Sequence, residues 1–137
     1  MAFHHGASMI VQGTFTVHME PEPPFDEVDG VTLNRATFAK RFTGPLDATS
    51  TVQMLAARTP EPRSAGYVAI ERIVGTLEGR TGSFVVVQLG IMDRDAQSLT
   101  VTIVPDSGTG ELKGVRGSMD IQIRDGAHHY ILDAQLP

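Results

Sequence analysis

Polar side chains interrupt the mainly apolar stretch that runs from Tyr67 to Met92, and three of them stand within its most apolar parts. Glu71, Arg72 and Gln88 lie there among valines, isoleucines and leucines. A charged group is costly to bury unless it is paired or hydrogen-bonded, so Glu71 is either solvated on an outer face, paired with a basic neighbour, or part of a site. In a protein interior its carboxyl group could transfer a proton or orient a ligand. The sequence therefore marks Glu71 as the candidate catalytic residue.

Gln88 is the second candidate, because an amide both donates and accepts hydrogen bonds. It could position a ligand, or it could simply satisfy a buried neighbour such as Glu71. With a two-residue turn at 79–80, Glu71 lies opposite Gln88 on an interior face. A loop longer by one residue would bring Arg72 beside Gln88 instead, since a one-residue slip moves every side chain to the other face. The first register also places two aromatic residues on the face of Glu71, Tyr67 and Phe84.

A second hairpin brings a cation to the same face. Alternation predicts strands over about 33–43 and 47–57, joined by a Gly-Pro turn at 44–45. A register that places apolar side chains opposite each other puts Lys40 opposite Ser50 on the apolar face. Lys40 could then pair with Glu71 or extend toward solvent at the end of the strands. The candidates for the wall of a ligand site, for which core packing is the plain alternative, are Phe15, Phe38, Met54, Tyr67 and Phe84.

The elements that must position these residues are all strands. Period-two alternation predicts about eight of them, near 9–19, 33–43, 47–57, 67–78, 81–92, 98–104, 118–124 and 129–136. Short strands separated by turn residues are typical of an all-β sandwich or barrel. The segment 20–30 holds three prolines and five carboxylates, so we expect a loop, which either covers one end of the fold or only connects strands.

Length, charge and the apolar runs of the sequence limit the domain number, the partners and the location that we expect. The 137 residues suit one domain, and we expect a flexible lead over residues 1–8 and a single β-barrel domain over 9–137. A net charge of −5 argues against nucleic acid and anionic membranes as partners. Without a secretion signal or an apolar run of about 20 residues, we expect a cytoplasmic protein.

Metal and thiol chemistry are not expected. The chain has no cysteine, which excludes disulfides and thiolate ligands. Its histidines, at positions 4, 5, 18, 128 and 129, show no ligand spacing, and His128 and His129 should point to opposite faces of a strand. We therefore expect no metal site and no cofactor.

Several short motifs together resemble a known family. They are Pro24-Phe25-Asp26-Glu27, Leu33-Asn34-Arg35-Ala36, Gly79-Arg80-Thr81-Gly82-Ser83-Phe84, Ser107-Gly108-Thr109-Gly110-Glu111-Leu112 and Tyr130-Ile131-Leu132-Asp133. From about Gly13 onward the chain resembles a bacterial family of unknown function whose known members fold as small barrels like allene oxide cyclase. The resemblance implies a closed antiparallel barrel of about eight strands with an apolar lumen. It also places the family's fourth-strand glutamate at Glu71 and its fifth-strand polar residue, often histidine, at Gln88.

The function that we expect is binding of a hydrophobic small molecule in the barrel lumen. If the protein is an enzyme, which stays open, cofactor-free isomerisation or cyclisation fits an enclosed apolar cavity. Glu71 would then supply the polarising or proton-transferring group, and Tyr67 and Gln88 would position polar atoms. The alternatives are a non-catalytic carrier of an apolar ligand and a homodimeric interaction module that uses the barrel wall.

Overall fold

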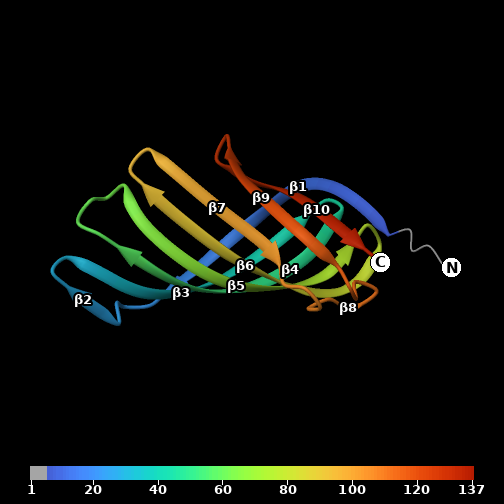
Figure 1. Cartoon of the computed structure of the whole chain (residues 1–137), viewed down its shortest axis with the longest axis horizontal. Helices are drawn as coiled ribbons and strands as arrows, with labels where there is room; N and C mark the ends of the chain where they lie inside the picture. The colour runs from blue at the N-terminus through green and yellow to red at the C-terminus, as the bar shows by residue number, and fades with distance from the viewer. Residues whose placement is uncertain (1–5) are drawn as a thin grey trace.

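The computed structural model of the chain describes residues 6–137, and every regular element within them is a β-strand (Figure 1). The strands are β1 (Ala7–Pro21), β2 (Asp26–Val28), β3 (Val31–Thr43), β4 (Leu46–Arg58), β5 (Ser64–Leu77), β6 (Arg80–Asp93), β7 (Ala96–Ile103), β8 (Thr109–Gly110), β9 (Arg116–Arg124) and β10 (Ala127–Leu136). The strand β1 begins two residues before the predicted Met9. Residues 1–5 of the predicted lead, with His4 and His5, lie outside the described residues.

Eight of these strands close into an antiparallel barrel. Hydrogen-bonded neighbours run in the order β1, β10, β9, β7, β6, β5, β4, β3, and β3 pairs back with β1. The strand β1 pairs with two neighbours along its length: residues 7–15 pair with β10, and residues 14–21 pair with β3. The short strands β2 and β8 pair with β3 and β6 outside this ring. The predicted closed, all-β barrel is therefore confirmed.

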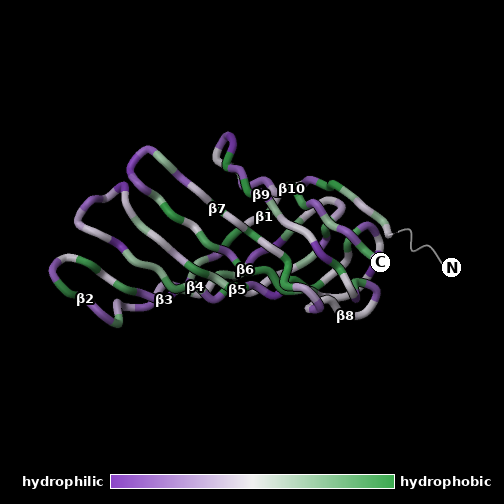
Figure 2. Tube along the Cα trace, in the orientation of Figure 1, coloured by the Kyte–Doolittle hydropathy of each residue, from purple (hydrophilic) through white to green (hydrophobic). Residues whose placement is uncertain are grey.

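The barrel interior differs between its two ends. Figure 2 shows apolar and polar residues alternating along the strands, and at one end the inward side chains are fully buried, among them Phe42, Leu46, Leu77, Phe84 and Tyr130. Leu112 and Val115, from the turn segment between β8 and β9, pack into the same cluster. We call this end the packed half.

At the opposite end the strands fan apart (Figure 1), and inward side chains meet solvent. The exposed fractions of five of them, which we call the rim residues, run from 36% to 69%; they are Val17, Met19, Met92, Leu99 and Ile123. Each lies an even number of residues from a buried interior residue of its own strand and therefore points to the same side. Leu99, for example, precedes the buried Val101 and Ile103 on β7. We call this end the open half.

The register between β5 and β6 differs by two residues from the prediction. The turn residues are Glu78 and Gly79, so Glu71 lies opposite Val86 rather than Gln88. Both turn residues have positive φ, 49° and 78°, as the type I′ hairpin turn requires. Because the shift is two residues, each side chain keeps its predicted face. Glu71 faces the interior, and Arg72 is exposed.

The hairpin of β3 and β4 has the predicted register, with Lys40 opposite Ser50.

The segment 20–30 differs from its prediction. It was expected to be a loop, but β1 continues to Pro21, and Asp26–Val28 forms β2, which folds back on β3 through a turn at Asp29 and Gly30. These turn residues have φ of 52° and 81°, the same left-handed pair as in the β5–β6 turn. The strand β2 therefore extends the barrel wall at the open end.

Tyr130 fastens β10 to the hairpin of β3 and β4. Its hydroxyl donates to the carbonyl oxygen of Thr43 at 2.9 Å and accepts from the backbone N–H of Leu46 at 3.1 Å. Gly13 provides the space, since a Cβ there would lie 2.6 Å from that hydroxyl. Burial raises the pKa of Tyr130, with the charge of Asp47 adding to it and the hydrogen bond to Leu46 opposing it. The phenol stays protonated and able to donate.

Candidate functional site

Five polar side chains from four strands gather inside the barrel, at the boundary between the packed half and the open half. They are Lys40 on β3, Ser50 on β4, Tyr67 and Glu71 on β5, and Gln88 on β6. Alternation turns each of them inward. The pairing of β3, β4, β5 and β6 side by side places them within reach of one another.

Glu71 is the centre of this polar network. Its Oε1 accepts hydrogen bonds from Lys40 Nζ at 3.2 Å and Gln88 Nε2 at 2.7 Å. Its Oε2 accepts from Ser50 Oγ at 2.6 Å. The residue is only 2% exposed, so these three donors, one of them a cation, replace the water that the carboxylate has lost.

Lys40 points into the interior rather than toward solvent. Its side chain is 8% exposed, and its ammonium lies 4.9 Å from the ring centroid of Phe15 and 5.9 Å from that of Phe42. A cation over an aromatic face is attracted by the ring quadrupole. The prediction that Lys40 could pair with Glu71 is confirmed, and the alternative of extension to solvent is wrong.

Tyr67 connects the network to the open half. Its hydroxyl donates to Gln88 Oε1 at 3.1 Å, and the residue is only half-buried. Burial raises the pKa of Tyr67, and the negative charge of Glu71 raises it further, so the phenol stays neutral. Gly90, opposite Tyr67 on β6, leaves room for the ring, because a Cβ there would lie 2.2 Å from a ring carbon.

The arrangement can hold and polarise a single polar group. An ammonium, an amide and a hydroxyl donate to one carboxylate, and the Tyr67 phenol donates to that amide. The ammonium of Lys40 balances the charge of the carboxylate. Both carboxylate oxygens already accept hydrogen bonds, so Glu71 fixes its neighbours in place. Tyr67, which is half-buried on the side of the open half, is the member of the network that a molecule entering from that end would meet first.

The structure divides the predicted wall residues between the two halves. Phe38 and Met54 are half-buried in the open half, beside the site. Phe15 and Phe84 are buried in the core cluster, where core packing accounts for them. Ser50 was not predicted as a site residue, although its position opposite Lys40 in the predicted register was the signal for it.

The histidines do not gather. Within residues 6–137, no three histidine or carboxylate side chains lie close enough to hold a metal ion. His128 packs its ring 5.1 Å from that of Phe15, and His18 contacts Glu20 at the surface. The same residues contain no helix that is long and apolar enough to cross a membrane.

Comparison with known proteins agrees with the fold. The family described as "Protein of unknown function (DUF3224)" matches residues 11–133. The crystal structure of a protein with unknown function from this family, from Shewanella oneidensis MR-1, is 44% identical in sequence and superimposes with a TM-score of 0.90, over 96% of this chain and 99% of that one. No curated protein matches. None of these comparisons links the chain to allene oxide cyclase, so that part of the resemblance stays a prediction.

Proposed function

The chain belongs to the DUF3224 family of unknown function, which brings no activity with it, and we propose from the geometry that the open half of the barrel binds an apolar small molecule. The observation that carries this proposal is a buried polar network beneath a solvent-accessible apolar rim. Ligand sites combine apolar walls with a few fixed polar groups that set orientation. Both parts are present here, on neighbouring strands.

The chemistry of the network favours an uncharged ligand with one hydroxyl or carbonyl group. A charged ligand group would disturb the balanced pair of Lys40 and Glu71 in a site shielded from water, where charges interact strongly. The neutral Tyr67 phenol can donate to a carbonyl or accept from a hydroxyl. The rim residues and the half-buried Phe38 and Met54 would contact the apolar remainder of the ligand.

Binding is better supported than turnover. An isomerase or cyclase needs a group that gives or takes a proton at the ligand. Glu71 is enclosed by three donors and buried, so we assign it the role of a positioning residue. The observation that favours catalysis is the neutral Tyr67 phenol, close to the Glu71–Lys40 pair, which could polarise a carbonyl. Isomerase activity is therefore the second candidate, and the cytoplasmic location stays a prediction.

The test uses two lysine substitutions at apolar side chains of equal exposure. Leu99 faces the interior at the rim and is 40% exposed, whereas Val31 lies at an outward position of β3 and is 39% exposed. The probe is N-phenyl-1-naphthylamine, a neutral apolar amine that fluoresces in apolar surroundings. We expect Leu99→Lys to weaken its binding at least about tenfold, since a charge at an apolar contact is unfavourable, while Val31→Lys leaves the affinity unchanged.

Two further results decide the proposal. Tyr67→Phe should weaken retention of an apolar ligand that native mass spectrometry detects on the wild-type protein as purified. Equal probe binding by both lysine variants, or loss in Val31→Lys alone, would show that the probe does not occupy the open half and would overturn the proposal.

A further inference from the structure

Much of the outer wall of β5 and β6 is apolar, although it faces away from the barrel interior. Its outward side chains are 41–52% exposed, together with one residue of β4; they are Leu55, Val68, Ile70, Val74, Val87, Leu89 and Ile91. We call these residues the outer apolar face. We propose that this face is the interface with a second copy of the chain.

The outward residues of other strands show the composition of a wall that faces only solvent. Outward residues of β1 are largely polar, as at Gln12, Thr14 and Thr16, and those of β9 include Arg116 and Asp120. An antiparallel sheet with one solvated face alternates between apolar and polar side chains, whereas strands covered on both faces are apolar throughout. The strands β5 and β6 follow the second pattern except at Arg72, an exposed outward residue between Ile70 and Val74, and within residues 6–137 the apolar side chains of this face stay 41–52% exposed.

The size of the face fits a protein partner. With strands about 4.8 Å apart and about 3.3 Å per residue, the region from β4 to β7 over residues 68–74 and 85–91 is roughly 15–20 Å wide and 20 Å long. This outline of roughly 300–400 Å² is about half of the roughly 800 Å² per partner of a standard interface, so the polar residues around the face would supply the rest as the rim of the interface. Monomers rarely leave apolar patches of more than a few hundred Å² exposed.

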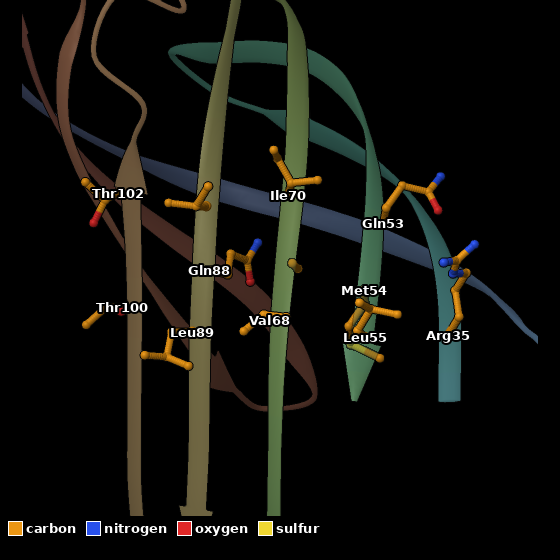
Figure 3. Close-up of a pocket in the computed structure, with 12 residues that line it drawn as sticks. Arg35, Gln53, Met54, Leu55, Val68, Ile70, Gln88, Leu89, Thr100 and Thr102 are labelled. Atoms are coloured by element: carbon orange, nitrogen blue, oxygen red, sulfur yellow. The ribbon is translucent and has the colours of Figure 1, made fainter. Parts of the chain in front are cut away.

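The shape of the face fits a second copy. A shallow hollow of about 610 Å³ lies over the outer apolar face (Figure 3), and a smaller one of about 370 Å³ lies farther along the same strands. Ile70 and Gln53 line both hollows and therefore form the ridge between them. In a two-fold pairing the same patch meets itself, so the ridge of each copy can enter a hollow of the other.

The experiment measures mass in solution by sedimentation equilibrium across a range of concentrations. We expect the wild-type chain, of 14.7 kDa, to associate to twice that mass. Ile70→Lys combined with Val87→Lys should weaken association by at least about 100-fold, with an unchanged far-ultraviolet circular dichroism spectrum. The matched control is Ile10→Lys, because Ile10 is an outward isoleucine of β1 with 74% exposure, and it should leave the dimer intact.

Several results would overturn the proposal. They are a wild-type protein that stays monomeric at several hundred micromolar, a dimer that survives the double substitution, or a dimer that dissociates in Ile10→Lys. A mass above that of a dimer would contradict the two-fold pairing. Co-sedimentation of the wild-type protein, but not the double variant, with phosphatidylcholine vesicles would assign the face to lipid instead.

Discussion

Phe42 and Phe38 lie on the same strand and the same face, yet they belong to different halves of the barrel. Phe42 is fully buried against Phe15 and Tyr130, whereas Phe38, four residues nearer the open end, is half-buried. Alternation makes both of them inward. What separates them is the turn segment between β8 and β9, which adds Leu112 and Val115 to one end of the interior. The direction of a side chain follows from its strand, but its burial follows from what fills that end.

The largest effect that we predict is a difference between these two phenylalanines. Phe42→Ala should lower the free energy of unfolding by about 3–5 kcal/mol, because it leaves a cavity in a packed core. Phe38→Ala should cost only about 1 kcal/mol, because the ring is already partly in water. Urea unfolding followed by circular dichroism measures both. Equal losses would mean that the open half is as tightly packed as the other.

The second prediction concerns the boundary between the halves, where Lys40 and Glu71 are buried. Lys40→Met should destabilise the protein by about 3 kcal/mol, because it leaves an uncompensated carboxylate in the interior. The double variant Lys40→Met with Glu71→Leu should recover most of that loss, since apolar replacement of a buried ion pair is often close to neutral.

The control is Arg41→Met, the adjacent outward residue, whose exposed pair with Asp47 should contribute less than about 1 kcal/mol. A double variant as unstable as the sum of the two single variants would show that Lys40 and Glu71 are not coupled.

The smallest effect separates the two tyrosines. Gly90→Ala places a methyl group against the ring of Tyr67, which should swing toward the open half and lose its hydrogen bond to Gln88, at a cost of about 1–2 kcal/mol. The pKa of Tyr67 should return toward 10.0, while that of Tyr130 stays raised. Ultraviolet titration of phenolate resolves this, because the chain has two tyrosines and no tryptophan.

The sign of the pH dependence follows from the raised values. A tyrosine whose folded pKa lies above 10.0 adds stability that is fully present below pH 10.0 and is lost as the pH rises through the folded pKa. Wild-type stability should therefore fall on the alkaline side of pH 10.0, and less steeply in Tyr67→Phe. An identical slope in both proteins would place the dependence on Tyr130 alone.

The sequence predicted the inward residues well, because a period of two is visible without any structure. The register of β3 and β4 was also predicted, since Gly44 and Pro45 mark a short turn. The predicted register of β5 and β6 was wrong by two residues because Glu78 adopts a positive φ, which is uncommon for a residue other than glycine.

The contacts of the site were harder to predict. Gln88 lies diagonal to Glu71 across the strand pair rather than directly opposite it. Ser50 donates the third hydrogen bond to the carboxylate, and a small hydroxyl residue on a strand by itself gives no sign of such a role. The apolar run from Tyr67 to Met92 indicated a buried hairpin. Only the three-dimensional arrangement separates its inward residues from its outer apolar face.

The shared strand β1 sets the order in which the molecule can assemble. Its second part can dock on β3 soon after the first hairpin forms, but its leading part must wait for β10, the last strand of the sheet. Such distant pairings make folding slow. Until they form, β1 and β9 each present a free edge to other strands. A nascent chain of this protein is therefore most prone to exchange strands with other chains just before β10 pairs with β1 and closes the barrel.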